Sequence, residues 1–411
     1  MNIRTNQMLI ACDYAIKWSV CAVVFALPFS KSLAECGIAI SIIAWISKKI
    51  LKKEMGVAYS ALNLSLLFYV LACVPSLFIS SYTALSLKAF ITKVVKYAAF
   101  YYVIIDTVDT KEMATDILII GFLSACVILV DGLVQYYGSG IDFLHNYPAF
   151  KMRVPWDPVG FFRGFPTASF PYPNDLAAWI VIVLFPAMAV ALFDLKKSMF
   201  RVFCAALSLG LLYLVFLTKV RSVWMGMILS IVYMAVSKKM TWLFIILVIV
   251  LALPFILKME MAQYIFQTGS LHDRMDMWKT GWEIFKQHPI IGNGVNTFFV
   301  TFMNLRQDEW KGTRGSYAHN CYLQMAADIG IVGLGAFAWV IIAYFTSVVR
   351  SLKHMTDPFY HNALWGLSIG VFVFLVQSFF DTNLYSLNLA ILFWCAIALS
   401  QSIIRITGKA S

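Results

Sequence analysis

Long runs of apolar residues recur along the chain, and they constrain its fold more than any other feature of the sequence. A helix needs about 20 such residues to cross the hydrocarbon core of a bilayer. Backbone groups at that depth must be satisfied within helices or closed barrels. The sequence therefore predicts an all-α polytopic membrane protein with about 12 transmembrane helices. We expect these helices near residues 14–30, 32–47, 60–80, 89–105, 115–134, 174–193, 202–218, 222–237, 240–257, 320–349, 362–380 and 387–404.

The composition excludes an ordinary soluble domain. Only 13% of the 411 residues are charged and 61% are hydrophobic, whereas soluble domains carry about 25% charged residues. The net charge of +11 is better explained by loop lysines that set topology, and by contacts with an anionic substrate or lipid head groups, than by nucleic acid. The eight cysteines are scattered and form no CxxC pair, so we expect neither disulfides nor a zinc site.

Lysine and arginine residues predict the orientation of the chain. They gather in the connections that follow the even-numbered runs, and such connections face the cytoplasm. Both termini are then cytoplasmic too, and the protein is expected in the inner membrane. The basic residues concerned are Lys48, Lys49, Lys52, Lys53, Lys196, Lys197, Arg201, Lys238, Lys239, Arg350, Lys353, Arg405 and Lys409.

Within a single membrane domain over 1–411, two longer polar stretches are expected on the periplasmic side, at 135–173 and 258–319. The second is too long for a plain connector, and such loops are often functional. Ser270 and Asp273 resemble a capping box that opens a helix, which Pro289 would end. This helix could lie flat on the membrane or pack against the bundle.

Several basic residues on the outer side are candidates for phosphate binding. Arg221 and Lys219 lie at the tight turn between the seventh and eighth runs, Arg274 lies in the loop helix, and Arg163 lies in the first outer stretch. The fork of an arginine suits a phosphate. Each of them could instead be an ordinary interfacial residue.

His319 and Asn320 precede the tenth run. The positive end of the helix dipole disfavours an imidazolium there, so we expect a neutral His319 that can accept a proton. The alternative is that the pair simply caps the helix. Asp381, at the outer end of the eleventh run, is the second candidate base.

Two further cations lie inside the fourth run. Lys93 and Lys96 are expected either to pair with Asp131 or another carboxylate, or to help hold an anionic head group. Gly330, Gly333 and Gly335 in the tenth run favour close helix packing. No phosphate-binding loop, metal-ligand cluster or other cofactor motif is recognisable, so we expect neither a metal nor a cofactor.

Three motifs in this order resemble the O-antigen ligase and O-antigen polymerase superfamily. They are Arg221 at an outer turn, the segment His272–Trp278 leading to His288–Gly294, and the segment Ala318–Gln324. The resemblance implies a membrane glycosyltransferase that uses a glycan linked to undecaprenyl pyrophosphate, without metal or nucleotide. It also implies that His319 is the general base and that Arg221 and Arg274 bind the pyrophosphate, with Arg163 a weaker match.

On this basis we expect an O-antigen ligase that transfers glycan to a sugar of lipid A-core oligosaccharide. A polymerase of O-antigen or exopolysaccharide, or a protein O-oligosaccharyltransferase of the same superfamily, is the first alternative. A transporter or flippase for lipid-linked oligosaccharide is the second. It would be expected to line a path through the bilayer with charge, whereas the candidate cations here gather on one side.

Overall fold

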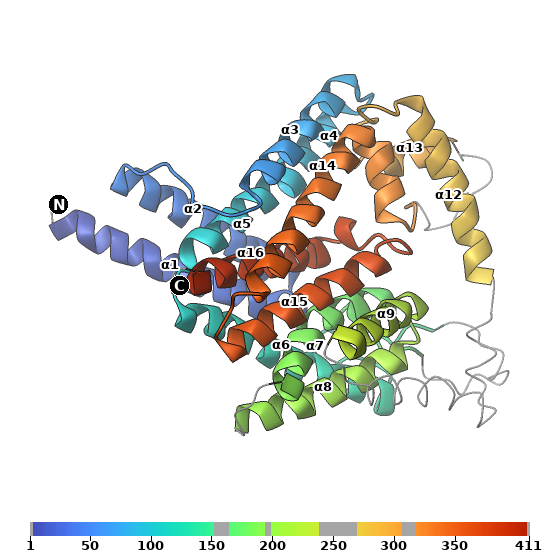
Figure 1. The fold of residues 1–411 in the computed structure, drawn as a ribbon. Coiled ribbons are helices and arrows are strands. Elements are labelled where there is room, and N and C mark those ends of the chain that lie inside the picture. Colours follow the sequence, from blue (N-terminus) through green and yellow to red (C-terminus); the bar gives the residue numbers. More distant parts are fainter. Residues whose placement is uncertain (1–2, 152–163, 194–198, 238–268, 306–316, 409–411) are drawn as a thin grey trace.

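A computed structural model of the chain describes residues 3–151, 164–193, 199–237, 269–305 and 317–408. Helices make up nearly all of the regular structure in these ranges (Figure 1). The first half contains α1 (Ile3–Ala26), α2 (Lys31–Lys52), α3 (Asn63–Ile79), α4 (Thr83–Ala89), the π-helical η1 (Phe90–Val95), α5 (Lys96–Thr107), α6 (Lys111–Tyr137) and α7 (Pro173–Phe193). The second half contains α8 (Met199–Thr218), α9 (Arg221–Ser237), α12 (Gly269–Gln287), α13 (Phe298–Leu305), α14 (Cys321–Leu352), α15 (Pro358–Gln377), the 3₁₀-helical η2 (Asn383–Tyr385) and α16 (Leu387–Gly408).

The predicted spans correspond closely to these helices. Seven of the described helices are long and apolar enough to cross a membrane, which confirms the all-α polytopic class. The fourth predicted span is the unbroken series α4, η1 and α5, and the ninth, 240–257, lies outside the described residues.

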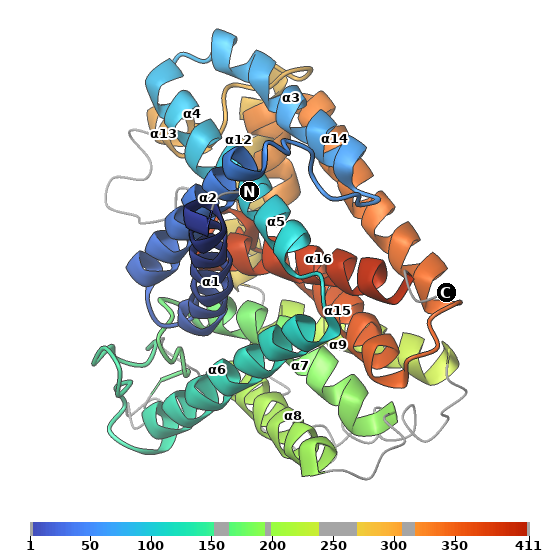
Figure 2. The same cartoon turned by 90° about the vertical axis from the view of Figure 1, so that its left-hand side faces the viewer.

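Three helices form the centre of the bundle. In α7, α15 and α16, between 78% and 89% of the apolar segment is buried, compared with 33% in α1. The close contact of α7 with α15 depends on small residues, because a Cβ atom added to Gly366 would lie 2.4 Å from the Cα of Pro186. Around this centre the other helices bury one side, and α3 lies along α14 (Figure 2).

The connections at one end of the bundle contact one another as the predicted topology requires. Lys111 pairs with Asp357 at 2.7 Å, and Arg405 donates to the carbonyl oxygen of Val108 at 3.0 Å. All four residues lie at ends predicted to be cytoplasmic. The alternating topology is therefore consistent with the packing, and the side that each end faces stays a prediction from the basic loops.

At the opposite end, α14 is broken by a glycine that admits a loop. Gly330 has φ 69° and ψ −175°, and the backbone N–H of Ile331 donates to Pro289 at 2.9 Å while that of Gly294 donates to Asp328 at 2.8 Å. The segment 288–297 therefore completes backbone hydrogen bonds that the broken helix leaves open. The prediction of close helix packing is wrong for Gly330, which meets this loop. It is also wrong for Gly335, because an added Cβ atom would meet nothing within 4 Å there.

The predicted loop helix is α12, and it packs against the bundle. Its Gly281 faces the side chain of Leu323 at the start of α14. The helix ends at Gln287, before Pro289, as expected. It is described from Gly269 on, so Ser270 lies inside the helix as its second residue, and the predicted capping box with Ser270 as the cap is wrong.

Candidate functional site

His319 stands immediately before α14 in an unusual backbone conformation. The helix is capped by the next residue, Asn320, whose side-chain oxygen accepts the backbone N–H groups of Tyr322 and Leu323 at 3.0 Å each. His319 itself has φ 46°, in the left-handed region that non-glycine residues rarely adopt. Such strain costs on the order of 1–3 kcal/mol and clusters at functional sites. Asn320 therefore has a structural role, and His319 is the residue held out of the helix.

The imidazole of His319 is oriented by a carboxylate from a distant part of the chain. Its Nδ1 lies 3.4 Å from Oδ1 of Asp381, in the turn between α15 and α16. The side chain of His319 is 34% exposed and that of Asp381 is 12% exposed. An Nδ1–H that faces the carboxylate leaves Nε2 without a proton, and Nε2 is then the nitrogen able to accept one.

Asp381 is held by two further donors. The side-chain amide of Asn174, in the first turn of α7, donates to Oδ2 at 2.5 Å, and the backbone N–H of Thr382 donates to Oδ1 at 2.8 Å. The outer ends of α7, α14 and α15 therefore meet at one carboxylate. We name His319, Asp381, Asn174 and Arg274 the His319 cluster.

The charge of Asp381 is stabilised despite its burial. Burial alone would raise the pKa of this carboxyl group. The hydrogen bond from His319, the backbone N–H of Thr382 and the electrostatic effect of the Arg274 guanidinium outweigh burial, so the pKa of Asp381 lies below its usual value. Asp381 therefore remains ionised at neutral pH, which suits an orienting acceptor better than the second base that the sequence suggested.

Arg274 reaches this cluster from α12. One helical turn further on, Trp278 packs edge-on against Phe379, with ring centroids 5.9 Å apart. Phe379 in turn contacts Tyr322 of α14, at 6.3 Å between centroids. These aromatic contacts fix α12 against the turn that carries Asp381, and the guanidinium of Arg274 interacts electrostatically with that carboxylate.

Arg221, the first residue of α9, lies near the same end of the bundle. Gly226 packs against Val373 of α15, where an added Cβ atom would approach to 3.0 Å. Five residues along antiparallel helices correspond to about 7.5 Å, which puts Arg221 at the level of Ser378, close to the Asp381 turn. Lys219, just before α9, has φ 58°. Its Nζ lies 5.2 Å from the ring centroid of Phe216, and burial lowers its pKa.

The other predicted cations have different surroundings. Lys96 pairs with Glu35 of α2 at 2.5 Å. The prediction of Asp131 as a partner is wrong, since Asp131 accepts from the backbone N–H of Phe143 at 2.9 Å and from the hydroxyl of Ser169 at 3.0 Å. Arg163 lies outside the described residues.

Lys93 belongs to a second polar cluster, which is buried next to the break in α14. Its Nζ donates to Asn296 at 2.8 Å and to the carbonyl oxygen of Tyr385 at 3.4 Å. Asp328 accepts the backbone N–H of Phe298 at 2.9 Å. We name Lys93, Asn296, Asp328 and Tyr385 the Asp328 cluster, and they surround a cavity of about 60 Å³.

Sequence reasoning did not predict the interactions that Asn174, Asn296 and Asp328 make. Asn174 follows Pro173 at the start of an apolar run, a pattern typical of turns and helix caps, and its link to Asp381 spans 207 residues of sequence. Asp328 offered one signal, an acidic residue two positions before a glycine within an apolar run. Such residues in membrane helices usually have a partner.

Comparison with known proteins finds a family that is similar to part of this chain. The family model described as O-Antigen ligase matches residues 205–338. Over this third of its length the chain is similar to the O-antigen ligase family. It is also 27% identical over 96 residues to the exopolysaccharide production protein ExoQ of Rhizobium meliloti strain 1021, a match that covers 22% of each chain.

The matched range of the superfamily model contains only part of the cluster. Arg221, Arg274 and His319 fall within residues 205–338, whereas Asn174 and Asp381 fall outside. The two residues that orient the histidine are therefore contributed by helices on either side of the matched segment.

Proposed function

We propose that the protein is an O-antigen ligase, which transfers a glycan from undecaprenyl pyrophosphate to a sugar hydroxyl of lipid A-core oligosaccharide. The observation that carries this proposal is the contact of His319 Nδ1 with Asp381 Oδ1 at 3.4 Å, in a cluster that also receives the charge of Arg274. A histidine oriented by a carboxylate beside a fixed cation suits proton removal next to a phosphate leaving group.

The reaction follows from this arrangement. His319 Nε2 accepts the proton of the acceptor hydroxyl, whose oxygen attacks the anomeric carbon of the donor sugar from the face opposite the leaving group. A new glycosidic bond forms as the bond from that carbon to the pyrophosphate oxygen breaks, with inversion. The bond electrons leave with the pyrophosphate, and in this proposal arginine side chains rather than a metal stabilise its growing charge.

The arginines act on the leaving group. Negative charge grows on the pyrophosphate as the bond breaks, and a guanidinium fork can hold two of its oxygens. In this proposal Arg274 and Arg221 supply the forks from α12 and α9, while Lys219 adds a point charge. Arg163 would contribute from the first outer stretch.

The site must face the periplasm for this donor to reach it. Reporter fusions near residues 52 and 352 should give cytoplasmic signals, and a fusion near residue 290 should give a periplasmic one. A cytoplasmic signal near 290 would contradict the proposal, because the His319 cluster would then face away from its donor.

The direct test is transfer by the purified protein. The protein is incubated with undecaprenyl-pyrophosphate-linked glycan and lipid A-core oligosaccharide, in the presence of a chelator and without ATP. We expect a glycosylated acceptor with inverted anomeric configuration. Equal amounts of His319→Ala protein serve as the control for contaminating transferases.

The name of the relative supports one alternative within the superfamily. ExoQ is an exopolysaccharide production protein, which favours a polymerase whose acceptor is a second lipid-linked repeat unit. Offering that acceptor, the lipid A-core and a protein hydroxyl to the same preparation separates ligase, polymerase and protein glycosylation. Donor that crosses the bilayer of a vesicle without transfer would favour a flippase.

A further inference from the structure

A large groove opens beside the His319 cluster, and the chemistry proposed above does not use it. Its volume is about 900 Å³, at the upper end of the range of about 300–1,000 Å³ that is common for ligand pockets. We name it the outer groove. It is lined by Pro28, Phe29, Ser30, Lys31, His145, Tyr147, Pro148, Ala149, Phe150, Lys151, Ser169, Phe170, Pro171, Tyr172 and Asn388.

The lining combines aromatic rings with basic side chains. Phe150 and Tyr172 pack edge-on at 6.0 Å and are 36% and 50% exposed. Lys31 and Lys151 are exposed at the rim, and none of the described lining residues is acidic. Flat aromatic faces suit the C–H faces of sugar rings, and the ammonium groups suit a phosphate or carboxylate carried by a sugar.

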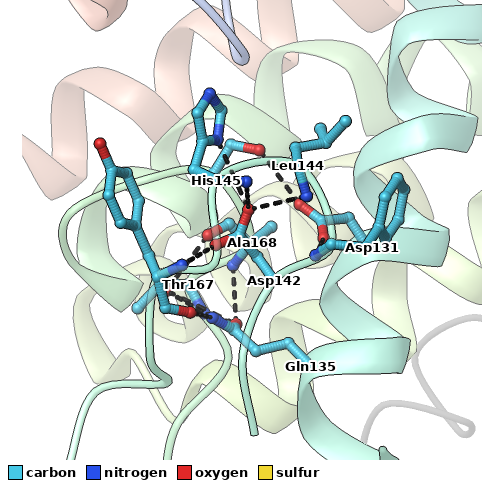
Figure 3. A network of polar contacts seen from close by, with 10 residues as sticks. Asp131, Gln135, Asp142, Leu144, His145, Thr167 and Ala168 are labelled. Atoms are coloured by element: carbon cyan, nitrogen blue, oxygen red, sulfur yellow. Dashed lines mark hydrogen bonds and ion pairs between the residues drawn. The ribbon is translucent and has the colours of Figure 1, made fainter. Parts of the chain in front are cut away.

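The loop that forms one wall is held in place by its own buried carboxylate (Figure 3). Asp142 is fully buried and accepts the backbone N–H groups of Leu144 at 3.2 Å, of His145 at 2.7 Å and of Tyr147. Oδ2 of Asp142 also lies 3.4 Å from Nδ1 of His145. The two lining residues of this turn, His145 and Tyr147, are therefore presented by a fixed backbone.

The end of α6 supports the same loop from beneath. Gln135 is fully buried. It accepts the backbone N–H groups of Thr167 at 2.7 Å and Ala168 at 2.9 Å, and it donates to the carbonyl oxygen of Tyr147 at 3.1 Å. A surface that is ordered before binding loses less entropy when a ligand arrives. The network thus favours a binding role for the outer groove over that of a simple connector.

One edge of the groove lies close to the residues that orient His319. Tyr172 is two residues from Asn174, so their Cα atoms are at most about 7.6 Å apart, and Asn174 donates to the carboxylate that orients His319. On the other wall, the ammonium of Lys31 interacts electrostatically with the carboxylate of Asp175. A chain of sugars bound in the groove would therefore end beside the reacting hydroxyl.

We propose that the outer groove binds an oligosaccharide that carries an acidic group, stacked on Tyr172 and Phe150 and anchored by Lys31 and Lys151. This inference rests on the proposed glycan transfer, which supplies two sources of such a chain. It is either the acceptor oligosaccharide or the sugar chain of the donor. In both cases the groove positions the chain and His319 performs the chemistry.

Two soluble probes distinguish these sources. One is the oligosaccharide released from the acceptor lipid, and the other is the oligosaccharide released from the lipid-linked donor by mild acid. Binding of each to the purified full chain is measured by calorimetry. We expect Tyr172→Ala to weaken binding of one probe by about tenfold and Lys151→Ala to weaken it to a similar degree. Tyr172→Phe, which keeps the ring, should bind nearly as the wild type does.

Matched controls lie at the opposite end of the bundle. Tyr59 is 82% exposed and Lys52 is exposed, so Tyr59→Ala and Lys52→Ala remove the same groups and should leave both probes unaffected. In transfer assays Tyr172→Ala should raise the KM of one substrate, namely the one that contains the oligosaccharide whose binding the variant weakens. The kcat should change by less than about threefold.

The outcomes separate this inference from the proposed function. If Tyr172→Ala and Lys151→Ala bind both probes as tightly as the wild type, the inference is wrong even when transfer is active. If the two variants bind both oligosaccharides normally but bind phosphatidylglycerol in nanodiscs less tightly than the wild type does, the groove is a lipid site and the inference is also wrong. Loss of oligosaccharide binding in a protein that transfers to none of the acceptors would support the groove and contradict the proposed transfer.

Discussion

Two polar clusters lie along the first part of α14, and they differ in how far their titratable groups are exposed. In the His319 cluster, the imidazole is 34% exposed and has one nitrogen directed at Asp381. In the Asp328 cluster, Asp328 is 2% exposed, and its carboxylate accepts from the backbone of the loop. One cluster keeps a titratable group available at the surface, and the other encloses a charge within the bundle.

This difference separates the proposed site of chemistry at His319 from the part of the fold that supports it. Lys93 and Asp328 interact electrostatically and hold the backbone of residues 296–298 against the break in α14. That break sets the direction of the outer part of α14, which begins at Cys321, two residues after His319. We therefore expect variants of the first cluster to lower the rate of transfer, and variants of the second to lower stability.

The largest effect is expected for the base. His319→Ala should lower kcat by about 10²–10⁴-fold, the usual contribution of general base catalysis. Binding of the lipid-linked donor should remain within about threefold of wild type, since the arginines are intact. The measurement is single-turnover transfer by the purified variant, together with donor binding.

Two results would change this assignment. Wild-type transfer by His319→Ala would show that the proton goes elsewhere. Lost donor binding would make His319 a phosphate ligand. As a matched control, His354→Ala removes a histidine that lies at the predicted cytoplasmic end, and it should transfer normally.

Substitution of the two arginines should have the second largest effect on the rate of transfer, after substitution of His319. Arg274→Ala and Arg221→Ala should each lower transfer by about 10²–10³-fold, as is typical when one charge-stabilising group is lost. Replacement by lysine should also impair transfer, because a point charge cannot replace the fork. Rates for both pairs of variants are compared at saturating acceptor. If the alanine variants fold and transfer normally, these arginines are only interfacial anchors.

The helices could be predicted from sequence because each is encoded locally. An apolar run of helical length has one stable arrangement in a bilayer, and the predicted span 174–193 differs from α7 by one residue at its start. Starts and breaks were less predictable. Gly330 was interpreted as a packing residue, but its left-handed conformation serves a loop about 40 residues earlier in the chain.

The candidate site was predictable only in part for the same reason. His319 stood out because polar residues at the start of an apolar run are unusual, and Arg274 because the resemblance marked it. Nothing near Asn174 in the sequence indicates that it donates to Asp381, since that bond depends on how α7 and α15 pack. For Lys96 the sequence left a carboxylate partner and an anionic head group as alternatives, and only the structure could show that Glu35 pairs with it.

A smaller effect on transfer is expected in the Asp328 cluster. Asp328→Ala leaves the buried N–H of Phe298 without its acceptor, at a cost of about 1–3 kcal/mol in unfolding free energy. The thermal midpoint in detergent should fall, while transfer per folded molecule should change by less than about threefold. A drop in kcat of a hundredfold at unchanged midpoint would contradict the comparison and place Asp328 in the chemistry. Asp116→Ala, on the partly exposed face of α6, is the control for removing a carboxylate.

The smallest effect is expected where a charge pair is self-contained. Lys96 and Glu35 satisfy each other at 2.5 Å, and the side chains are 17% and 36% exposed. Lys96→Met alone leaves the carboxylate of Glu35 without its cation, and Glu35→Gln alone leaves the ammonium of Lys96 without its anion. Each single variant should therefore lower the thermal midpoint. The double variant should recover most of that loss, with a coupling free energy of about 0.5–3 kcal/mol. Transfer should stay within about twofold of wild type in all three variants, because neither residue contacts the His319 cluster through any described interaction. If Lys96→Met lowers transfer tenfold and the double variant does not recover it, Lys96 acts on the substrate. Lys96 would then belong with the substrate-binding cations and not with the structural ones.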